Sequence, residues 1–186
     1  SPAAYLIPPV DDASENLIIL NNKTLENDNR YLDTLAHEGY PGHLYHYQYL
    51  RTLINKTGYT RQALSMGGYY ESWSQSGEVF FDNYNDKFGA PYCNFMSANS
   101  MIGNLILPAI VSIEVNYFGK SADDMFDLTS AYFGDEAATE LKDVYYDYAV
   151  ENPFYFLEYA MGYSIYQQKL REAEDICGAS FDLRSF

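Results

Sequence analysis

The sequence has few basic residues and few histidines. It carries 11 Lys and Arg against 26 Asp and Glu, which gives a formal net charge of −15 over 186 residues. Contacts to phosphate groups need a basic surface, so this balance disfavours binding to nucleic acid. It disfavours an anionic membrane surface for the same reason. We therefore expect neither a nucleic-acid partner nor membrane contact by this chain.

Long apolar runs and closely spaced cysteines are also missing. The longest apolar run, residues 105–115, is broken by a proline, a serine and a glutamate and is too short to span a bilayer. The two cysteines, Cys93 and Cys177, lie far apart and do not have the spacing of a metal site. They either pair with each other or remain free, and we expect free, buried thiols.

Aromatic residues are plentiful, with 20 tyrosines and 11 phenylalanines. Together with a hydrophobic content of 47%, they argue against disorder and predict one well-buried domain over residues 1–186. Tyrosine combines apolar area with a polar tip, which suits half-polar clefts and interfaces as well as an amphipathic core lining. No repeat or linker divides the chain.

The local patterns predict a mainly α-helical fold with a small N-terminal β-hairpin. Two short apolar runs, residues 4–8 and 16–20, flank a turn-rich segment and indicate two strands. Caps, prolines and glycines predict the helix boundaries. The expected helices cover residues 24–38, 43–57, 61–66, 71–83, 91–115 with a kink near Pro108, 121 onward, 135–150 and 153–177. Gly67 and Gly68 are expected to interrupt the helical pattern, either to allow a close helix approach or as a local kink.

All three histidines lie in one segment, residues 34–46, with the sequence TLAHEGYPGHLYH. Glu38 follows His37 directly. Imidazole ligands next to a carboxylate that can take a proton are typical of a metal site that activates water. This segment is therefore the main candidate for chemistry.

The histidine spacing leaves three interpretations open. His37 and His43 are six residues apart, so on a regular helix they point roughly 240° away from each other. A helix break within Gly-Tyr-Pro-Gly, residues 39–42, would bring them together. Alternatively, His43 and His46 share a helix face without distortion. The third interpretation is a helix end with a Pro-Gly turn and no metal.

Two glutamates downstream favour the metal. Glu71 and Glu78 are seven residues apart and share one face of a helix. A glutamate from a second helix is the usual third ligand of a His-Glu-His zinc site. The alternative is a solvated acidic face, which is common in so acidic a chain.

These motifs carry a resemblance to a known family. His37 to His43, HEGYPGH, resembles the H-E-x-x-P-G-H signature of the bacterial "domain of unknown function 885" family, whose members are regarded as gluzincin-like zinc metallopeptidases. Residues 71–78, ESWSQSGE, are similar to its second signature, E-G-W-A-L-Y-x-E. Residues 153–171 resemble a third block, and residues 181–186 resemble the family's F-D-L-R-x-F. Because that motif normally continues, and because no Met begins the chain, we expect an excised part of a longer protein.

The sequence also departs from the family pattern. Ser72, Ser74 and Ser76 replace small and aromatic residues of the second block. The family often has a D-x-G-x-H segment, and its nearest counterpart, residues 112–117, has serine, glutamate and asparagine at those places. If that segment positions substrate, specificity differs. The ligand and base positions are retained.

The resemblance implies a zinc-dependent peptidase. In this interpretation His37, His43 and Glu71 bind zinc and leave one position for water, whose pKa falls toward about 7. Glu38 acts as general base on that water and then passes the proton to the leaving amine of a peptide substrate.

Supporting roles are assigned around this set. Tyr159 and Tyr163 flank a glycine of the third block and are candidate donors to the oxyanion. Glu78 is a candidate acceptor for a ligand histidine, and His46 supports a ligand or lines the cleft. Arg171 pairs either with a substrate carboxylate or with a neighbouring glutamate.

Alternatives to the peptidase remain at this point. One is a non-catalytic, metal-stabilised domain, and the other is a tyrosine-rich binding domain in which the histidines have no special role. In gluzincin-like enzymes an edge strand binds the substrate backbone, so residues 16–21 are a candidate for that role, although a purely structural hairpin fits equally. The resemblance and the acidic surface predict an extracytoplasmic setting.

Overall fold

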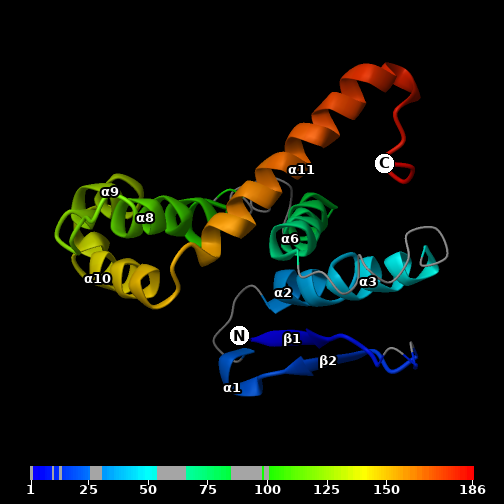
Figure 1. Cartoon of the computed structure of the whole chain (residues 1–186), viewed down its shortest axis with the longest axis horizontal. Coiled ribbons are helices and arrows are strands. Elements are labelled where there is room, and N and C mark those ends of the chain that lie inside the picture. Colours follow the sequence, from blue (N-terminus) through cyan, green and yellow to red (C-terminus); the bar gives the residue numbers. More distant parts are fainter. Residues whose placement is uncertain are drawn as a thin grey trace. The chain divides into compact units, whose positions relative to one another are not determined.

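The computed structural model describes residues 2–9, 11–12, 14–25, 31–53, 66–84, 98 and 101–186. In these residues the chain is mainly helical with a small N-terminal two-stranded antiparallel hairpin (Figure 1), which confirms the predicted fold class. The sequence predicts a single domain, and the structure adds that the chain folds as two compact units. Unit 1 comprises residues 1–97 and 162–186, and unit 2 comprises residues 98–161.

The hairpin lies at the start of unit 1. Strand β1 (Ala3–Leu6) pairs antiparallel with β2 (Leu17–Leu20), with Ala3 opposite Leu20. Both strands fall within or next to the apolar runs that predicted them. In Figure 1, β1 is the strand nearer to α2 (Tyr31–Glu38), and the contacts of Tyr5 described below place it there as well.

The remaining elements of unit 1 are helical. They are α1 (Asn22–Leu25), α2, α3 (His43–Thr52), α6 (Gly67–Tyr84) and the part of α11 (Tyr155–Cys177) that begins at Gly162. The helix predicted over residues 24–38 is found as α1 and α2, and residues 26–30 lie outside the described part. The helix predicted from His43 is α3, and its expected extension over 54–57 and the helix at 61–65 also lie outside the described residues.

The sequence predicts that a helix resumes at Glu71 after an interruption at Gly67 and Gly68. Instead, α6 begins at Gly67, so that boundary was wrong. The glycines allow a close approach of two helices: a Cβ on Gly162 of α11 would lie 2.0 Å from the carbonyl oxygen of Gly68. The two backbones are therefore in direct contact, which a side chain at position 162 would prevent.

Unit 2 is a helical cluster around one apolar core. Its elements are a π-helical turn (Ile102–Ile106), α8 (Leu107–Asn116), α9 (Met125–Phe133), α10 (Asp135–Glu151) and the first turns of α11. The buried cluster consists of Leu107, Val111, Val115, Met125 and Ala149.

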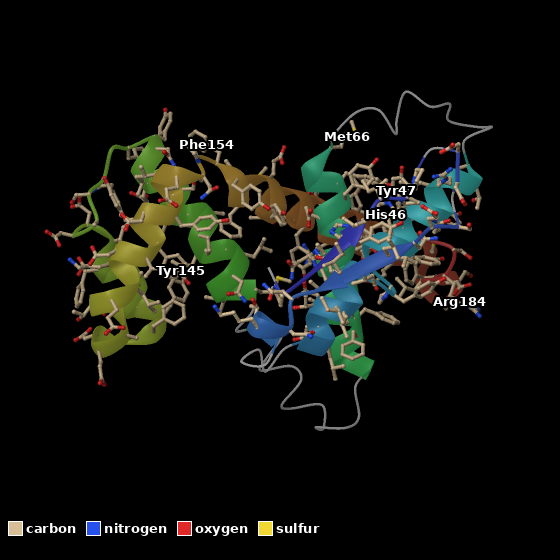
Figure 2. The ribbon with its side chains drawn as sticks, turned by 90° about the horizontal axis from the view of Figure 1, so that it is seen from below. His46, Tyr47, Met66, Tyr145, Phe154 and Arg184 are labelled. Atoms are coloured by element: carbon tan, nitrogen blue, oxygen red, sulfur yellow. The ribbon has the colours of Figure 1, made fainter. Side chains whose placement is uncertain are left out.

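The π-helical turn lies directly before Pro108, where the sequence predicted a kink. The N–H of Leu107 donates to the carbonyl of Ile102, and Pro108 has no N–H to donate. The carbonyl of Gly103 therefore lacks a helical donor. Tyr145 of α10, labelled in Figure 2, supplies one through its hydroxyl at 2.8 Å. The expected beginning of this helix at Pro91 lies outside the described residues.

The last two helices begin and end where their capping residues predict. Helix α10 begins at Asp135, and α11 follows Asn152 and Pro153. Helix α11 ends at Cys177, before Gly178, whose φ of 52° is readily adopted only by glycine. Cys177 is a free thiol but is exposed, so the prediction of burial was wrong, because the residue lies at a solvated helix end. Cys93 lies outside the described residues.

Ser112 fixes the turn between α10 and α11. Phe154 has a φ of 60°, and its N–H donates to the Ser112 hydroxyl at 2.9 Å. Asn116 donates to the same hydroxyl at 3.2 Å and to the carbonyl of Ala149 at 3.0 Å. The segment that departs from the family pattern thus stabilises unit 2 internally. Among the described helices, none is both long and apolar enough to cross a membrane.

Candidate metal centre

The break between α2 and α3 brings two histidines together. Helix α2 ends at Glu38 and α3 begins at His43, so the regular helical phase is lost between them. The rings of His37 and His43 meet edge to face, with centroids 4.7 Å apart. This confirms the expected helix break at residues 39–42. The alternative pair of His43 and His46 is not the one that forms the cluster described below.

Backbone hydrogen bonds fold the connecting loop over the end of α2. Gly39 donates its N–H to Leu35, and Gly42 donates its N–H to Ala36, both at 2.9 Å. A Cβ on Gly42 would lie only 1.7 Å from the carbonyl oxygen of His37. The loop can therefore take this path only with glycine at position 42.

The single tryptophan holds the same loop from α6. Trp73 donates its indole N–H to the carbonyl of Pro41 at 2.8 Å, and the Tyr40–Pro41 peptide bond is cis. Its ring stacks on His46 with centroids 4.8 Å apart. His46, labelled in Figure 2, is 2% exposed and also packs against Tyr69. The structure thus places His46 in the aromatic packing between α3 and α6.

Three potential ligand atoms converge where α2, α3 and α6 meet. Glu71 Oε2 lies 3.3 Å from His37 Nε2 and 3.3 Å from His43 Nε2. One ligand atom from each of the three residues lies within 4.8 Å of the other two. Among the residues that the structure describes, no other trio of His, Cys, Asp or Glu side chains is arranged in this way.

Glu78 lies behind the first histidine. His37 Nδ1 donates to Glu78 Oε1 at 2.6 Å, and the other oxygen of Glu78 accepts a hydrogen bond from Gln75 Nε2 at 3.1 Å. A carboxylate on Nδ1 fixes the orientation of the ring and leaves Nε2 for a metal. The sequence analysis missed Gln75, although its spacing of one helical turn from Glu78 was a usable signal.

Hydrogen bonds within the cluster shift the pKa values of His37 and Glu71. Burial lowers the pKa of His37, but hydrogen bonds to Glu71 and Glu78 outweigh it and raise the pKa from 6.5 to about 10. Burial raises the pKa of Glu71, but hydrogen bonds from His37 and His43 outweigh it and lower the pKa from 4.5 to about 2. In the metal-free chain His37 is therefore a cation between two carboxylates.

These shifts predict how the stability of the metal-free chain depends on pH. The His37 contribution is fully present below pH 6.5 and is lost as the pH rises toward about 10. The Glu71 contribution is present above pH 4.5 and is lost as the pH falls toward about 2. The free energy of unfolding, measured in urea with a chelator, should therefore be largest between about pH 4.5 and pH 6.5, where both contributions are present. His37→Asn should flatten the alkaline decline, and a wild-type curve equally flat would contradict the ion pair.

Glu38 is bound to the hairpin. Its Oε2 accepts a hydrogen bond from the backbone N–H of Tyr5 in β1 at 2.7 Å. The strand that contacts Glu38 is therefore β1, and the role of residues 16–21 as a substrate-binding strand stays a prediction. Tyr5 was missed because nothing local in the sequence indicates a contact across 33 residues.

The other predicted residues are not members of the three-residue ligand cluster. Burial raises the pKa of Tyr163, and the charges of Arg171 and Glu78 act on this pKa in opposite directions. Arg171 is exposed. Tyr159 belongs to unit 2, where its hydroxyl pairs with that of Tyr155 at 2.6 Å. The roles assigned to Tyr159, Tyr163 and Arg171 stay predictions.

Comparisons of the chain with protein-family models, with curated proteins and with solved structures find no match. The resemblance of its motifs to the family named above stays a prediction. The case for a function therefore depends on the geometry of the site.

Proposed function

We propose that this chain is a zinc-dependent peptidase in which His37, His43 and Glu71 hold the metal. The observation that carries the proposal is the convergence of two imidazole nitrogens on one carboxylate oxygen at 3.3 Å each. Glu78, on the far side of the His37 ring, strengthens it.

The residue types fit zinc, and so do the two distances that join Glu71 Oε2 to the histidine nitrogens. Two imidazoles and one carboxylate form a common catalytic zinc set, which leaves a fourth position open. Ligand atoms at about 2.0–2.1 Å from a tetrahedral zinc lie about 3.3 Å from one another. The separations of Glu71 Oε2 from the two histidine nitrogens, 3.3 Å in each case, have this value.

Glu38 is the proposed general base. When bound, zinc lowers the pKa of a coordinated water toward about 7 and polarises a carbonyl oxygen. Glu38 would accept the proton of the attacking water as the water oxygen bonds to the substrate carbonyl carbon. It would then deliver that proton to the amine nitrogen as the C–N bond breaks. Tyr163 is the proposed hydrogen-bond donor to the developing oxyanion.

The substrate class follows from this chemistry and from charge. A water activated beside a proton-accepting carboxylate suits hydrolysis of peptide or small amide bonds. The net charge of −15 makes an anionic polymer a poor substrate. The motif resemblance supports the same assignment, and an extracytoplasmic setting remains part of the proposal.

Zinc titration with mass-spectrometric metal analysis tests the metal site. We expect one zinc per chain, with little or no binding in His37→Ala and Glu71→Ala. Glu78→Gln should bind zinc about 10–100-fold more weakly, because it weakens the support of His37 without removing a ligand.

Matched controls keep this test specific. His46→Phe removes an imidazole but keeps an aromatic ring in the packing, and Glu174→Ala removes an exposed carboxylate of α11. Both should retain zinc. A wild-type chain that binds no zinc, or ligand variants that bind it as well as the wild type, would refute the metal centre. A peptide library digested with and without chelator then tests hydrolysis.

A non-catalytic, metal-stabilised domain is the second candidate. It is favoured by one observation, namely that the three ligands come from α2, α3 and α6, so a bound metal would cross-link three elements of unit 1. Zinc binding without turnover would support it.

A further inference from the structure

The Glu38 carboxylate is held at one oxygen only. Its Oε2 accepts the N–H of Tyr5 at 2.7 Å, a short hydrogen bond to a charged acceptor. Within the described part of the chain, no residue donates to Glu38 Oε1. One oxygen is therefore anchored and the other remains available to accept a proton.

The Tyr5 N–H is not needed by the hairpin. Tyr5 lies opposite Ile18 in the register of β1 and β2. Residues in antiparallel strands alternate between pairs that exchange ladder hydrogen bonds and pairs that do not. Because the Tyr5 N–H donates to Glu38, it points out of the ladder, and the outer edge of β1 faces the end of α2.

Side-chain contacts attach the hairpin to α3. Asn16 Oδ1 accepts hydrogen bonds from the Tyr5 hydroxyl at 2.9 Å and from Gln48 Nε2 at 2.6 Å. Arg51 donates to the carbonyl of Pro9 at 3.1 Å. Gln48 and Arg51 lie on α3, which begins with the candidate ligand His43. The position of β1 is thus set by a helix that also carries a ligand.

We propose that the N-terminal hairpin is a positioning element of the site, and that the backbone N–H of Tyr5 aims the Glu38 carboxylate. The proposal extends the proposed function and depends on it for its catalytic consequence. Tyr5 acts through Glu38 and is a positioning residue. The hydrogen bond itself can be tested without metal or substrate.

Amide exchange measured by NMR on the metal-free chain tests the contact. In Glu38→Ala the Tyr5 amide should exchange about tenfold faster or more, as expected for the loss of one hydrogen bond to a charged acceptor. Glu15→Ala, which removes an exposed carboxylate near the hairpin turn, should leave the rate unchanged. Unchanged Tyr5 exchange in Glu38→Ala would overturn the proposal.

Steady-state kinetics of the zinc-loaded chain test the consequence. Tyr5→Ala removes the ring and keeps the N–H, whereas Tyr5→Pro removes the N–H at a position outside the ladder. We expect kcat to be about a hundredfold lower in Tyr5→Pro than in Tyr5→Ala, with equal KM and zinc content, as for a misplaced catalytic group. In a Glu38→Gln background the two variants should have equal rates.

The outcomes separate the two proposals. Equal kcat for Tyr5→Pro and Tyr5→Ala would overturn the positioning role even if the wild type is active. A zinc-loaded wild type without turnover would refute the peptidase, and the amide exchange would then decide the Tyr5–Glu38 contact independently.

Discussion

Glu38→Gln is expected to lower peptide turnover by about 10²–10⁴-fold while leaving zinc affinity nearly unchanged. The amide has almost the same shape as the carboxylate and can still accept the hydrogen bond from Tyr5. It cannot accept the proton from the water, and positioned general bases contribute a factor of this size. The measurements are kcat/KM on a peptide identified from the library and zinc affinity by titration.

Glu174→Gln provides the matched control, since it makes the same chemical change at an exposed position of α11. It should retain full activity. An active Glu38→Gln would exclude Glu38 as the base. A wild type that binds zinc and cleaves no peptide would instead favour the metal-stabilised domain.

Gly42→Ala should disrupt the metal centre and destabilise unit 1. The added Cβ would lie 1.7 Å from the carbonyl oxygen of His37 and 2.5 Å from that of Ala36. Overpacking lowers the free energy of unfolding by about 1–3 kcal/mol where neighbouring side chains can move aside. Here the added Cβ meets backbone atoms, so we expect a loss of about 3 kcal/mol or more. Urea unfolding of the metal-free chain measures this loss. Zinc affinity should fall with it, because the loop sets the distance between the two histidines.

Gly103→Ala provides the comparison for this substitution. Its Cβ would meet its nearest neighbour, a ring carbon of Phe133, at an ordinary 3.5 Å. We expect a change within about 1 kcal/mol and no effect on zinc. A Gly42→Ala chain with wild-type stability and zinc affinity would show that the loop can follow a different path.

The sequence predicted best those features that short segments determine. Asp135, the Asn152–Pro153 pair and Gly178 bound their helices within a residue or two, because caps and proline act on their own turn. The N-terminal hairpin was predicted from two apolar runs. The start of α6 was misplaced, because a glycine pair looks the same locally whether it kinks a helix or lets a second helix approach.

In the candidate site, too, the features set by short segments were predicted and those set by contacts between distant segments were not. The Gly-Tyr-Pro-Gly spacing predicted the helix break that brings His37 to His43, and the seven-residue spacing predicted that Glu71 and Glu78 share a face. Tyr5 could not be predicted, because its contact with Glu38 depends on how the hairpin docks. The π-helical turn was also missed, since it results from Pro108 together with a distant tyrosine.

The ion pairs of His37 would hold the proposed zinc site in one arrangement both with and without the metal. In the metal-free chain the positively charged imidazolium of His37 pairs with the carboxylates of both Glu71 and Glu78. Zinc binding would then replace the His37 proton with a metal ion, so the apparent zinc affinity should weaken by about tenfold for each unit of falling pH. Acidification would release the metal while the charged histidine keeps α2 and α6 joined. Unlike a zinc finger, the chain would keep its shape through repeated loading and release.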